Sequence, residues 1–431
     1  MVVFRPFRGC RYNPDVAGDM ATVLCPPYDL IGAELKESLK QLSPYNAVHL
    51  EGGEQPDPVD PEGSYLQAAT LFQEWLHQGV LRRDETPGFY LMRHGYQFRG
   101  QAKAHLGLFG DVQVDDYEQR SVLPHEFTRE PAVLDRVALL DACKAQFSPI
   151  MSLYRDVEGA LKPLLDEIMS AQPVVDVQDS TEGAISFWRI DDLETQQRIT
   201  DCFAAMPIFL ADGHHRYEAA LRYRRQQAQA TATTDNEAAH NYVTMALVEF
   251  DDPGLLLLPY HRVIGGLSDQ QLIQIKGKLN ELFEVQPVSL DPTQPIIDLL
   301  DQVETVGKNR HTLGVVEMGT RGPSLLALRE EIDWQQWGPL AVSEAWVLEE
   351  KVIRPVLGDV TAQNVNYPHD HEEAVAQVTA GTQQLVFLLK PFPMETFEAI
   401  VGGGQRLPSK STFFYPKLPT GLVINQLEGR L

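Results

Sequence analysis

The sequence predicts an α+β protein with two domains: a mixed-sheet N-terminal domain over residues 1–265 and a smaller C-terminal α/β sandwich over residues 266–431. The length of 431 residues exceeds what one average core holds. Residues 88–114 alternate in the manner of a β-hairpin. After residue 266 a β-α-β order followed by a hairpin is typical of a small open sheet with helices on one side.

The composition excludes several classes of protein. Hydrophobic content of 43% and charged content of 22% are ordinary for a soluble globular chain. No apolar run approaches the ~20 residues of a membrane span, and the N-terminus lacks the apolar core of a signal peptide. A formal charge of −24 opposes binding to nucleic acid. Four scattered cysteines without metal-binding spacing indicate reduced thiols, so we expect a cytoplasmic protein without membrane or nucleic-acid partners.

Periodicity predicts the elements of the N-terminal domain. The helix at 64–79 has a face of large apolar residues, including Phe72 and Trp75, and Gly79 closes it. The other predicted helices cover residues 33–42, 132–145, 156–172, 191–204 and 214–229. Predicted strands outside the hairpin cover residues 46–50, 147–154, 173–177, 184–189, 208–211, 240–250 and 255–259.

The same patterns continue in the C-terminal domain. Predicted helices cover residues 269–283, 294–304, 343–357, 371–380 and 394–401. Predicted strands cover residues 284–289, 311–318, 324–329 and 384–390.

The densest polar group follows the predicted strand at 208–211. Asp212 and Gly213 break the apolar run, and a helical pattern begins at His214. The first turn of a helix presents backbone N–H groups and the positive end of the helix dipole, which suit a phosphate. Arg216 can add a bidentate contact to the same anion, and the Asp212 carboxylate is a candidate magnesium ligand.

These residues also have structural interpretations. Asp212 is a common type of helix N-cap, and His214 and His215 can be solvated. We favour a functional interpretation of the group, because Asp-Gly-His-His-Arg at a strand-to-helix turn occupies a place where α/β proteins put their sites.

Other candidate residues lie in loops and at strand ends. Tyr28 follows the Pro26-Pro27 pair, and His125-Glu126 precede a helix. The second histidine of a HExxH zinc motif is missing there, which leaves Glu126 as a candidate general base. His261-Arg262 follow the strand at 255–259. Lys410 and Lys417 lie in a basic, hydroxyl-rich segment that lacks the glycines of a P-loop and is equally compatible with a terminal strand.

Several motifs together resemble a prokaryotic family known as the domain of unknown function numbered one thousand and fifteen. They run from residue 5 to residue 417, and they are Arg5-Pro6-Phe7-Arg8-Gly9, Pro26-Pro27-Tyr28-Asp29, His125-Glu126-Phe127-Thr128, Ala211-Asp212-Gly213-His214-His215-Arg216 and Lys410-Ser411-Thr412-Phe413-Phe414-Tyr415-Pro416-Lys417. The family label itself implies no activity.

A more distant resemblance concerns residues 211–220. Gly213, Arg216, Ala219 and Ala220 have the order G-x-x-R-x-x-A-A, which is similar to the phosphate-binding signature of the ParB and sulfiredoxin-like superfamily. Free serine kinases of that superfamily carry a related Asp-Gly-His-His-Arg form. The resemblance implies a ParB/sulfiredoxin-like core and nucleotide phosphates near Gly213, His214, His215 and Arg216, with Asp212 near metal or substrate. Those kinases use a glutamate base from an earlier loop, for which Glu126 is our candidate, although this chain is much longer and lacks the basic DNA-binding helices of ParB proteins.

The leading hypothesis is a phosphotransferase that uses magnesium (Mg2+) with ATP or ADP and acts on a small hydroxyl compound, with free L-serine as the named candidate. Phosphoryl transfer needs mainly positioning and charge neutralisation. In this hypothesis Glu126, Asp212 and His215 are catalytic; Gly213, His214, Arg216, Lys410 and Lys417 bind the nucleotide; and Tyr28, His125 and Arg262 contact the substrate.

Two alternatives belong to other classes of protein. One is a metal-dependent hydrolase, for which the candidate ligands are His125, Glu126, Asp212, His214, His215 and His261. The other is a nucleotide-binding module without turnover. The sequence leaves the true substrate, the phosphoryl donor and the oligomeric state open.

Overall fold

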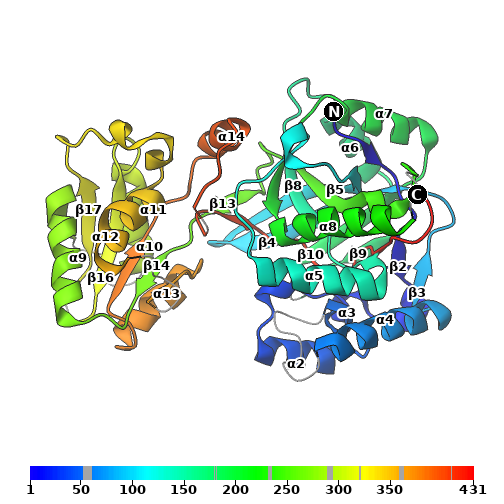
Figure 1. Cartoon of the computed structure of the whole chain (residues 1–431), viewed down its shortest axis with the longest axis horizontal. Coiled ribbons are helices and arrows are strands. Elements are labelled where there is room, and N and C mark those ends of the chain that lie inside the picture. Colours follow the sequence, from blue (N-terminus) through cyan, green and yellow to red (C-terminus); the bar gives the residue numbers. More distant parts are fainter. Residues whose placement is uncertain are drawn as a thin grey trace. The chain divides into compact units, whose positions relative to one another are not determined.

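The computed structural model describes residues 1–51, 61–178, 180, 182–231, 235–288, 295–319, 322–358, 364–408 and 410–431. Internal contacts divide the chain into two compact units. Unit 1 comprises Met1–Leu255 and Pro416–Leu431, and unit 2 comprises Leu256–Tyr415. Each unit has its own sheet and helices, which confirms the predicted α+β class (Figure 1).

The described residues of unit 1 form a nine-stranded mixed sheet with the order β6-β11-β8-β12-β5-β4-β10-β9, and β1 pairs with β5 outside this path. The pairs β6–β11 and β8–β12 are parallel, and the other neighbours are antiparallel. The predicted hairpin is confirmed as β4 and β5. The strands are β1 (Phe4–Arg5), β4 (Phe89–Phe98), β5 (Gln101–Gln113), β6 (Val122–Leu123), β8 (Ile150–Tyr154), β9 (Val175–Val177), β10 (Ala184–Ile190), β11 (Ile208–Asp212) and β12 (Tyr242–Glu249).

One hydrophobic core of unit 1 lies between one face of this sheet and three helices. Helix α6 contributes Leu161 and Leu164, α7 contributes Ile199 and Phe203, and α8 contributes Tyr217. A second cluster joins α5 to α8, which lie side by side in Figure 1. The helices of unit 1 are α1 (Pro14–Ala17), α2 (Ala33–Leu42), α3 (Val48–Glu51), α4 (Pro61–His77), α5 (Glu130–Cys143), α6 (Leu161–Met169), α7 (Leu193–Phe203) and α8 (His214–Thr231).

The end of the chain returns to unit 1 and pairs with segments from its beginning and middle. Strand β21 (Asn425–Gln426) pairs with β7 (Ala145–Gln146), and Ile424 and Thr420 form isolated bridges with Cys10 and Cys25. A further small ribbon joins β2 (Cys10–Tyr12) to β3 (Leu81–Arg83). This return brings Lys417 and Thr420 into the same unit as the predicted site at Asp212.

The strand predicted at residues 46–50 is wrong, because the segment folds into helix α3. The Asn46 side chain accepts a hydrogen bond from the Val48 backbone N–H and donates to the carbonyls of Thr22 and Leu24. Such local bonds from an asparagine favour a turn or helix start over a strand.

Unit 2 contains an antiparallel sheet with the order β15-β17-β16-β19-β14-β18. Its strands are β14 (Arg262–Ile264), β15 (Phe283–Pro287), β16 (Thr312–Glu317), β17 (Ser324–Leu328), β18 (Val365–Asn366) and β19 (Leu385–Leu388), and β13 (Leu256–Leu258) pairs separately with β20 (Phe413–Tyr415). Residues 289 and 294, at the ends of two predicted elements, lie outside the described residues.

Helices cover both faces of this sheet, so the prediction of helices on one side is wrong. Successive residues of β19 alternate between two cores: Leu385 and Phe387 face one, and Val386 and Leu388 face the other. The first core includes α9 and the segment from α11 through the π-helix, and the second includes α10 and α13. The helices are α9 (Asp269–Leu282), α10 (Pro295–Val306), α11 (Glu344–Val347), the π-helix Leu348–Ile353, α12 (Arg354–Leu357), α13 (His371–Thr379) and α14 (Met394–Gly402).

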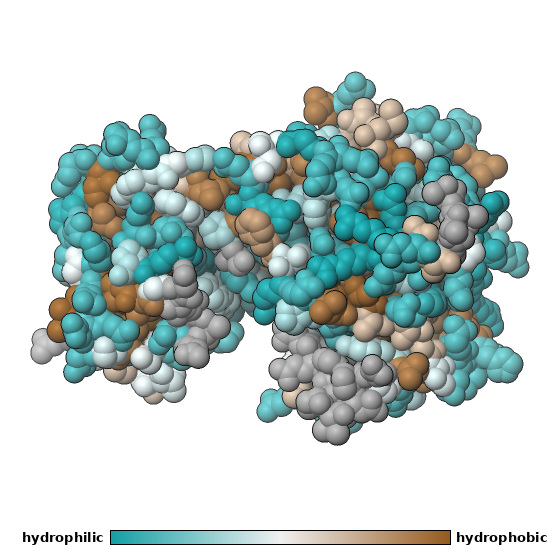
Figure 2. All heavy atoms as spheres, in the orientation of Figure 1, coloured by the Kyte–Doolittle hydropathy of each residue, from teal (hydrophilic) through white to brown (hydrophobic). Residues whose placement is uncertain are grey.

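In the part of the chain that the structure describes, the helices are too short or too polar to cross a lipid bilayer. Helix α8 illustrates this, because it carries the exposed Arg225 and the half-buried Arg222. Its outer face is hydrophilic in Figure 2.

Candidate functional site

Strand β11, a tight turn and helix α8 form the strand-turn-helix that the sequence predicts at residues 208–231. The pairing of β11 with β8 shifts register between Leu210 and Asp212, so one extra residue bulges at the end of the strand and re-aims Asp212. Gly213 has φ +94°, a conformation that favours glycine. A Cβ atom at Gly213 would lie 3.0 Å from Nε of Arg216, so the guanidinium packs directly against the glycine.

Asp212 binds two cations. Its Oδ2 accepts a hydrogen bond from Nη2 of Arg216 at 2.5 Å, and its Oδ1 accepts one from Nζ of Lys417. Burial alone would raise the pKa of Asp212, but the charges of Lys417 and Arg216 lower it well below its usual range. Asp212 is therefore a carboxylate at neutral pH, and the three side chains together carry one net positive charge.

Arg216 is held from a second direction. Its Nη1 donates to the carbonyl of Pro149 at 2.5 Å. Its Nε is buried and makes no hydrogen bond with the residues that the structure describes. The guanidinium is thus fixed in place while one of its donors stays available.

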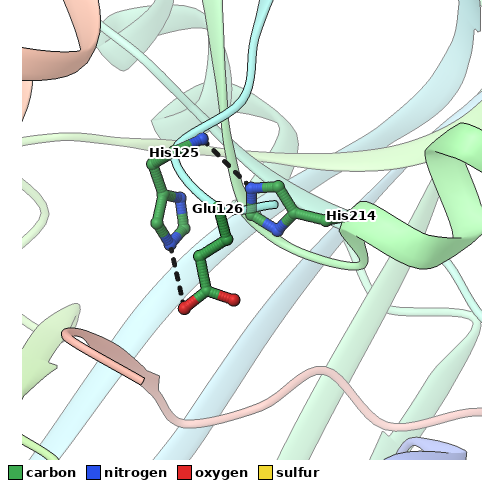
Figure 3. A group of neighbouring side chains, drawn as sticks. All are labelled: His125, Glu126 and His214. Carbon is green, nitrogen blue, oxygen red and sulfur yellow. Dashed lines mark hydrogen bonds and ion pairs between the residues drawn. The ribbon is translucent and has the colours of Figure 1, made fainter. Parts of the chain in front are cut away.

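His214 and His215 hold the preceding loop against the first turn of α8. The backbone N–H of His125 donates to Nε2 of His214 at 3.2 Å, and the backbone N–H of Arg129 donates to Nε2 of His215 at 3.1 Å. Figure 3 shows the first of these contacts. Each acceptor nitrogen must carry a lone pair, so neither Nε2 is protonated. Both histidines therefore position residues 125–129.

His125 and Glu126 lie beside this turn. The Nδ1–H of His125 donates to the Leu210 carbonyl at 2.6 Å, and its Nε2 lies 3.9 Å from Oε1 of Glu126 (Figure 3). Burial lowers the pKa of His125, although Glu126 acts in the opposite direction. His125 is therefore neutral at pH 7, and the half-buried Glu126 carboxylate is the more accessible group of the two.

His125, Glu126 and His214 form a group with metal-ligand chemistry, because one potential ligand atom of each lies within 4.8 Å of the others. Their contacts only partly fit a metal. The Nε2 lone pair of His214 already accepts the His125 backbone N–H, so coordination through this atom would replace that hydrogen bond.

A buried network around Arg136, with Glu51 and Ser148 as members that the sequence did not predict, lies near this site. Glu51 pairs with Arg136 at 2.9 Å and accepts a hydrogen bond from the Ser148 hydroxyl. The guanidinium of Arg136 lies 4.0 Å from the ring centre of Tyr28. One signal was present in the sequence: Arg136 stands among the apolar residues of α5, where an arginine is rarely buried without a partner. Nothing in the spacing of Glu51 or Ser148 indicated their roles.

Two predicted residues, Arg262 and Lys410, belong to unit 2 and contact each other there. Nη1 of Arg262 donates to the carbonyl of Lys410 at 3.0 Å, and Nη2 pairs with Glu349 at 2.7 Å. His261 also lies in unit 2, where its Nδ1 accepts the Leu389 backbone N–H at 3.2 Å. Within unit 1 the structure gathers His125, Glu126, Asp212, Gly213, His214, His215, Arg216 and Lys417 around one turn.

The fold and these side chains define an α+β protein with a charged cluster at a strand-to-helix turn. The chain belongs to the family described as "Protein of unknown function (DUF1015)", whose model matches residues 4–349. The search of curated proteins finds no match.

Several solved structures are similar at low identity. A free serine kinase variant in complex with AMP is 13% identical, with a TM-score of 0.37 over 75% of this chain and 92% of that chain. SbnI with a C-terminal truncation, from Staphylococcus aureus, is 13% identical, with a TM-score of 0.36 over 74% of this chain and 87% of that chain. A conserved hypothetical protein from Pyrococcus furiosus is 12% identical, with a TM-score of 0.33 over 75% of this chain and 95% of that chain.

Proposed function

We propose that this protein is a nucleotide-dependent phosphotransferase that acts on a small hydroxyl compound, with free L-serine as the first acceptor to test. The observation that carries the proposal is the pair of cations, Arg216 and Lys417, on the single carboxylate of Asp212 at the start of α8. Their net positive charge adds to the positive end of an 18-residue helix. Phosphoryl transfer depends mainly on such positioning and charge neutralisation.

The residues of the turn fit a nucleotide phosphate. Gly213 has no side chain to block approach to the turn, and the charges of Arg216 and Lys417 lie beside it. The first helical backbone bond runs from the Tyr217 N–H to the Gly213 carbonyl, so the preceding N–H groups lie outside the helical ladder. When bound, ATP or ADP with magnesium supplies the phosphoryl group.

The sequence also predicted that Asp212 binds magnesium directly, and this stays a prediction. Both of its oxygens contact cations, and these cations would repel a third positive charge. We therefore assign Asp212 the role of holding Arg216 and Lys417 in place, and we expect magnesium to be held mainly by the nucleotide phosphates.

Glu126 is the proposed acceptor of the hydroxyl proton. Its side chain is 23% exposed, beside the buried His125, whereas the Glu51 carboxylate is buried against Arg136. A general base must reach the proton it removes, and an accessible carboxylate next to the charged turn meets this condition.

Phosphorus NMR tests the proposal directly. The purified full chain would be incubated with magnesium and ATP, then with magnesium and ADP, against a panel of amino acids and polyols. We expect a new phosphomonoester signal with wild-type protein and none with Lys417→Met. Free phosphate without acceptor dependence would indicate a nucleotide hydrolase, and tight nucleotide binding without product would indicate a binding module; either result would overturn the proposal.

The cluster of His125, Glu126 and His214 favours a second candidate, a metal-dependent hydrolase. Metal analysis of the same purified sample tests it. Stoichiometric zinc, manganese or iron that is lost in His125→Ala would support the hydrolase, and a metal-free sample that still turns over nucleotide would exclude it.

A further inference from the structure

A cavity of about 40 Å³ in unit 1 is lined by Arg216 and by the buried Glu51–Arg136 pair. Glu51, Arg136, Ser148 and Arg216 form part of its wall, and Leu140 and Ala145 are among the apolar residues that complete it. A volume of this size holds roughly three waters, since one water needs on the order of 10–15 Å³ of such space. A carboxylate group is of similar size.

One wall of this cavity is a fixed polar network. The side chains of Glu51 and Arg136 are 3% and 5% exposed. The Ser148 hydroxyl contacts both Glu51 and the Thr420 hydroxyl, the latter at 2.9 Å. Burying an ion pair is unfavourable unless further hydrogen bonds satisfy its atoms. The pair has these bonds, with Asp135 on Arg136 and the Ser148 hydroxyl on Glu51, and it lines a cavity that a small polar ligand can enter.

Arg216, from the charged cluster at Asp212, also lines this cavity. Arg136 is compensated by Glu51 and also by Asp135, at 2.9 Å and 2.6 Å, whereas Asp212 alone compensates both Arg216 and Lys417. Arg216 is 11% exposed, and its Nε makes no hydrogen bond with the described residues. The cavity thus offers cationic donors from Arg216 and Arg136 together with acceptors from Glu51 and Ser148.

We infer that this cavity binds the carboxylate end of a small hydroxy- or amino-carboxylic acid. The carboxylate contacts Arg216, and a donor of the ligand, a hydroxyl or an ammonium group, contacts Glu51 and Ser148. The negative charge of the carboxylate suits Arg216, because Arg216 shares its carboxylate partner, Asp212, with Lys417. The inference rests on the proposed function for the role of this ligand as the phosphoryl acceptor, but its binding is independent of any turnover.

Equilibrium titration of the full chain with three probes tests the chemistry of the subsite. Glycolate carries the carboxylate and the hydroxyl, acetate only the carboxylate, and ethylene glycol only hydroxyls. We expect glycolate to bind about tenfold more tightly than acetate, the size of one extra hydrogen bond to a charged group, and ethylene glycol not to bind. Equal binding of ethylene glycol and glycolate would overturn the inference.

Two substitutions fill the cavity from different walls, Ala145→Leu and Leu140→Phe. Each should weaken glycolate at least about tenfold and leave ATP and ADP affinity within about twofold. Leu134→Phe is the matched control, because Leu134 lies on the same helix as Leu140 but is 52% exposed. Unchanged glycolate affinity in a folded filling variant would contradict the subsite.

Ser148→Ala keeps the cavity open and removes one hydroxyl. It therefore tests glycolate binding in the cavity even if a filling variant does not fold. We expect glycolate to lose its advantage over acetate while acetate affinity stays the same. Nucleotide binding without glycolate or acetate binding would refute this inference alone. Glycolate binding without nucleotide binding would refute the proposed function and keep the subsite.

Discussion

Arg216 and Arg262, both candidate site residues from the sequence, each pair with a carboxylate at a similar distance but in different surroundings. Arg216 contacts Asp212 at 2.5 Å in unit 1, and Arg262 contacts Glu349 at 2.7 Å in unit 2. The Arg262 side chain is fully buried, and its Nη1 also donates to the carbonyls of Tyr260 and Lys410. Asp212 instead binds a second cation, Lys417, beside a glycine with positive φ.

The difference separates a structural pair from a candidate binding pair. At Arg262 one carboxylate balances one arginine, and the Tyr367 ring lies 4.8 Å from the guanidinium. At Asp212 one carboxylate balances two cations, so positive charge is left over. An excess of charge at a helix start has no stabilising role of its own, whereas it suits an anionic ligand.

Breaking the pair in unit 2 should have the largest effect on stability. Arg262→Met leaves the Glu349 carboxylate without its cation, and we expect the free energy of unfolding to fall by about 3 kcal/mol. Urea unfolding followed by tryptophan fluorescence measures it, because Trp334, Trp337 and Trp346 lie in unit 2. The double variant Arg262→Met with Glu349→Leu should recover most of the loss. Full stability with loss of turnover would instead support the substrate role predicted for Arg262.

Breaking the pair in unit 1 should affect activity more than stability. Arg216→Met removes a cation beside the proposed phosphate position, and we expect phosphotransfer to fall roughly 100- to 1000-fold. Arg222→Met is the matched control on the same helix, since Arg222 forms partly exposed pairs with Glu130 and Glu218. Turnover measured at saturating nucleotide should change less than about twofold in that control. Equal losses in both variants would show that α8 acts only as a scaffold.

The sequence predicted the fold where local patterns decide it and failed where distant segments meet. The β4–β5 hairpin and the β11–α8 turn follow from alternation, an Asp-Gly break and helical spacing. The partnership of Lys417 with Asp212 depends on the return of the chain end across 205 residues, which no local pattern encodes. The role of Glu51 was not predicted for a related reason. The hydrogen bond from the Val48 backbone N–H to the Asn46 side chain starts helix α3, which ends at Glu51, where the sequence predicted a strand.

A third carboxylate, Asp111, is buried without a cationic partner among its hydrogen bonds, in contrast to Asp212 and Glu349. It accepts hydrogen bonds from Thr244 and Asn425. Burial raises the pKa of Asp111 to about 7, although these hydrogen bonds oppose the rise. The folded state therefore keeps this proton at pH values where the unfolded chain, with a pKa of about 4, has lost it.

We expect Asp111 to make unit 1 less stable as pH rises from about 4 to 7. The slope is at most about 1.4 kcal/mol per pH unit, since the folded state then binds more protons than the unfolded state. Asp111→Asn should flatten this slope in urea unfolding measured across the same range. Asp166→Asn is the exposed control, because its side chain is 51% exposed. An identical pH profile for wild type and Asp111→Asn would contradict the assignment.

The smallest effect should come from loosening the loop next to the charged turn. His215→Ala removes the acceptor of the Arg129 backbone N–H, a neutral hydrogen bond worth about 1 kcal/mol. We expect hydrogen exchange at the Arg129 amide to accelerate about fivefold and turnover to fall by a similar factor. His215→Gln keeps an acceptor oxygen and should restore part of both. If His215→Ala instead lowers turnover as much as Arg216→Met does, without faster exchange at Arg129, His215 contacts the phosphate directly and does not only position the loop.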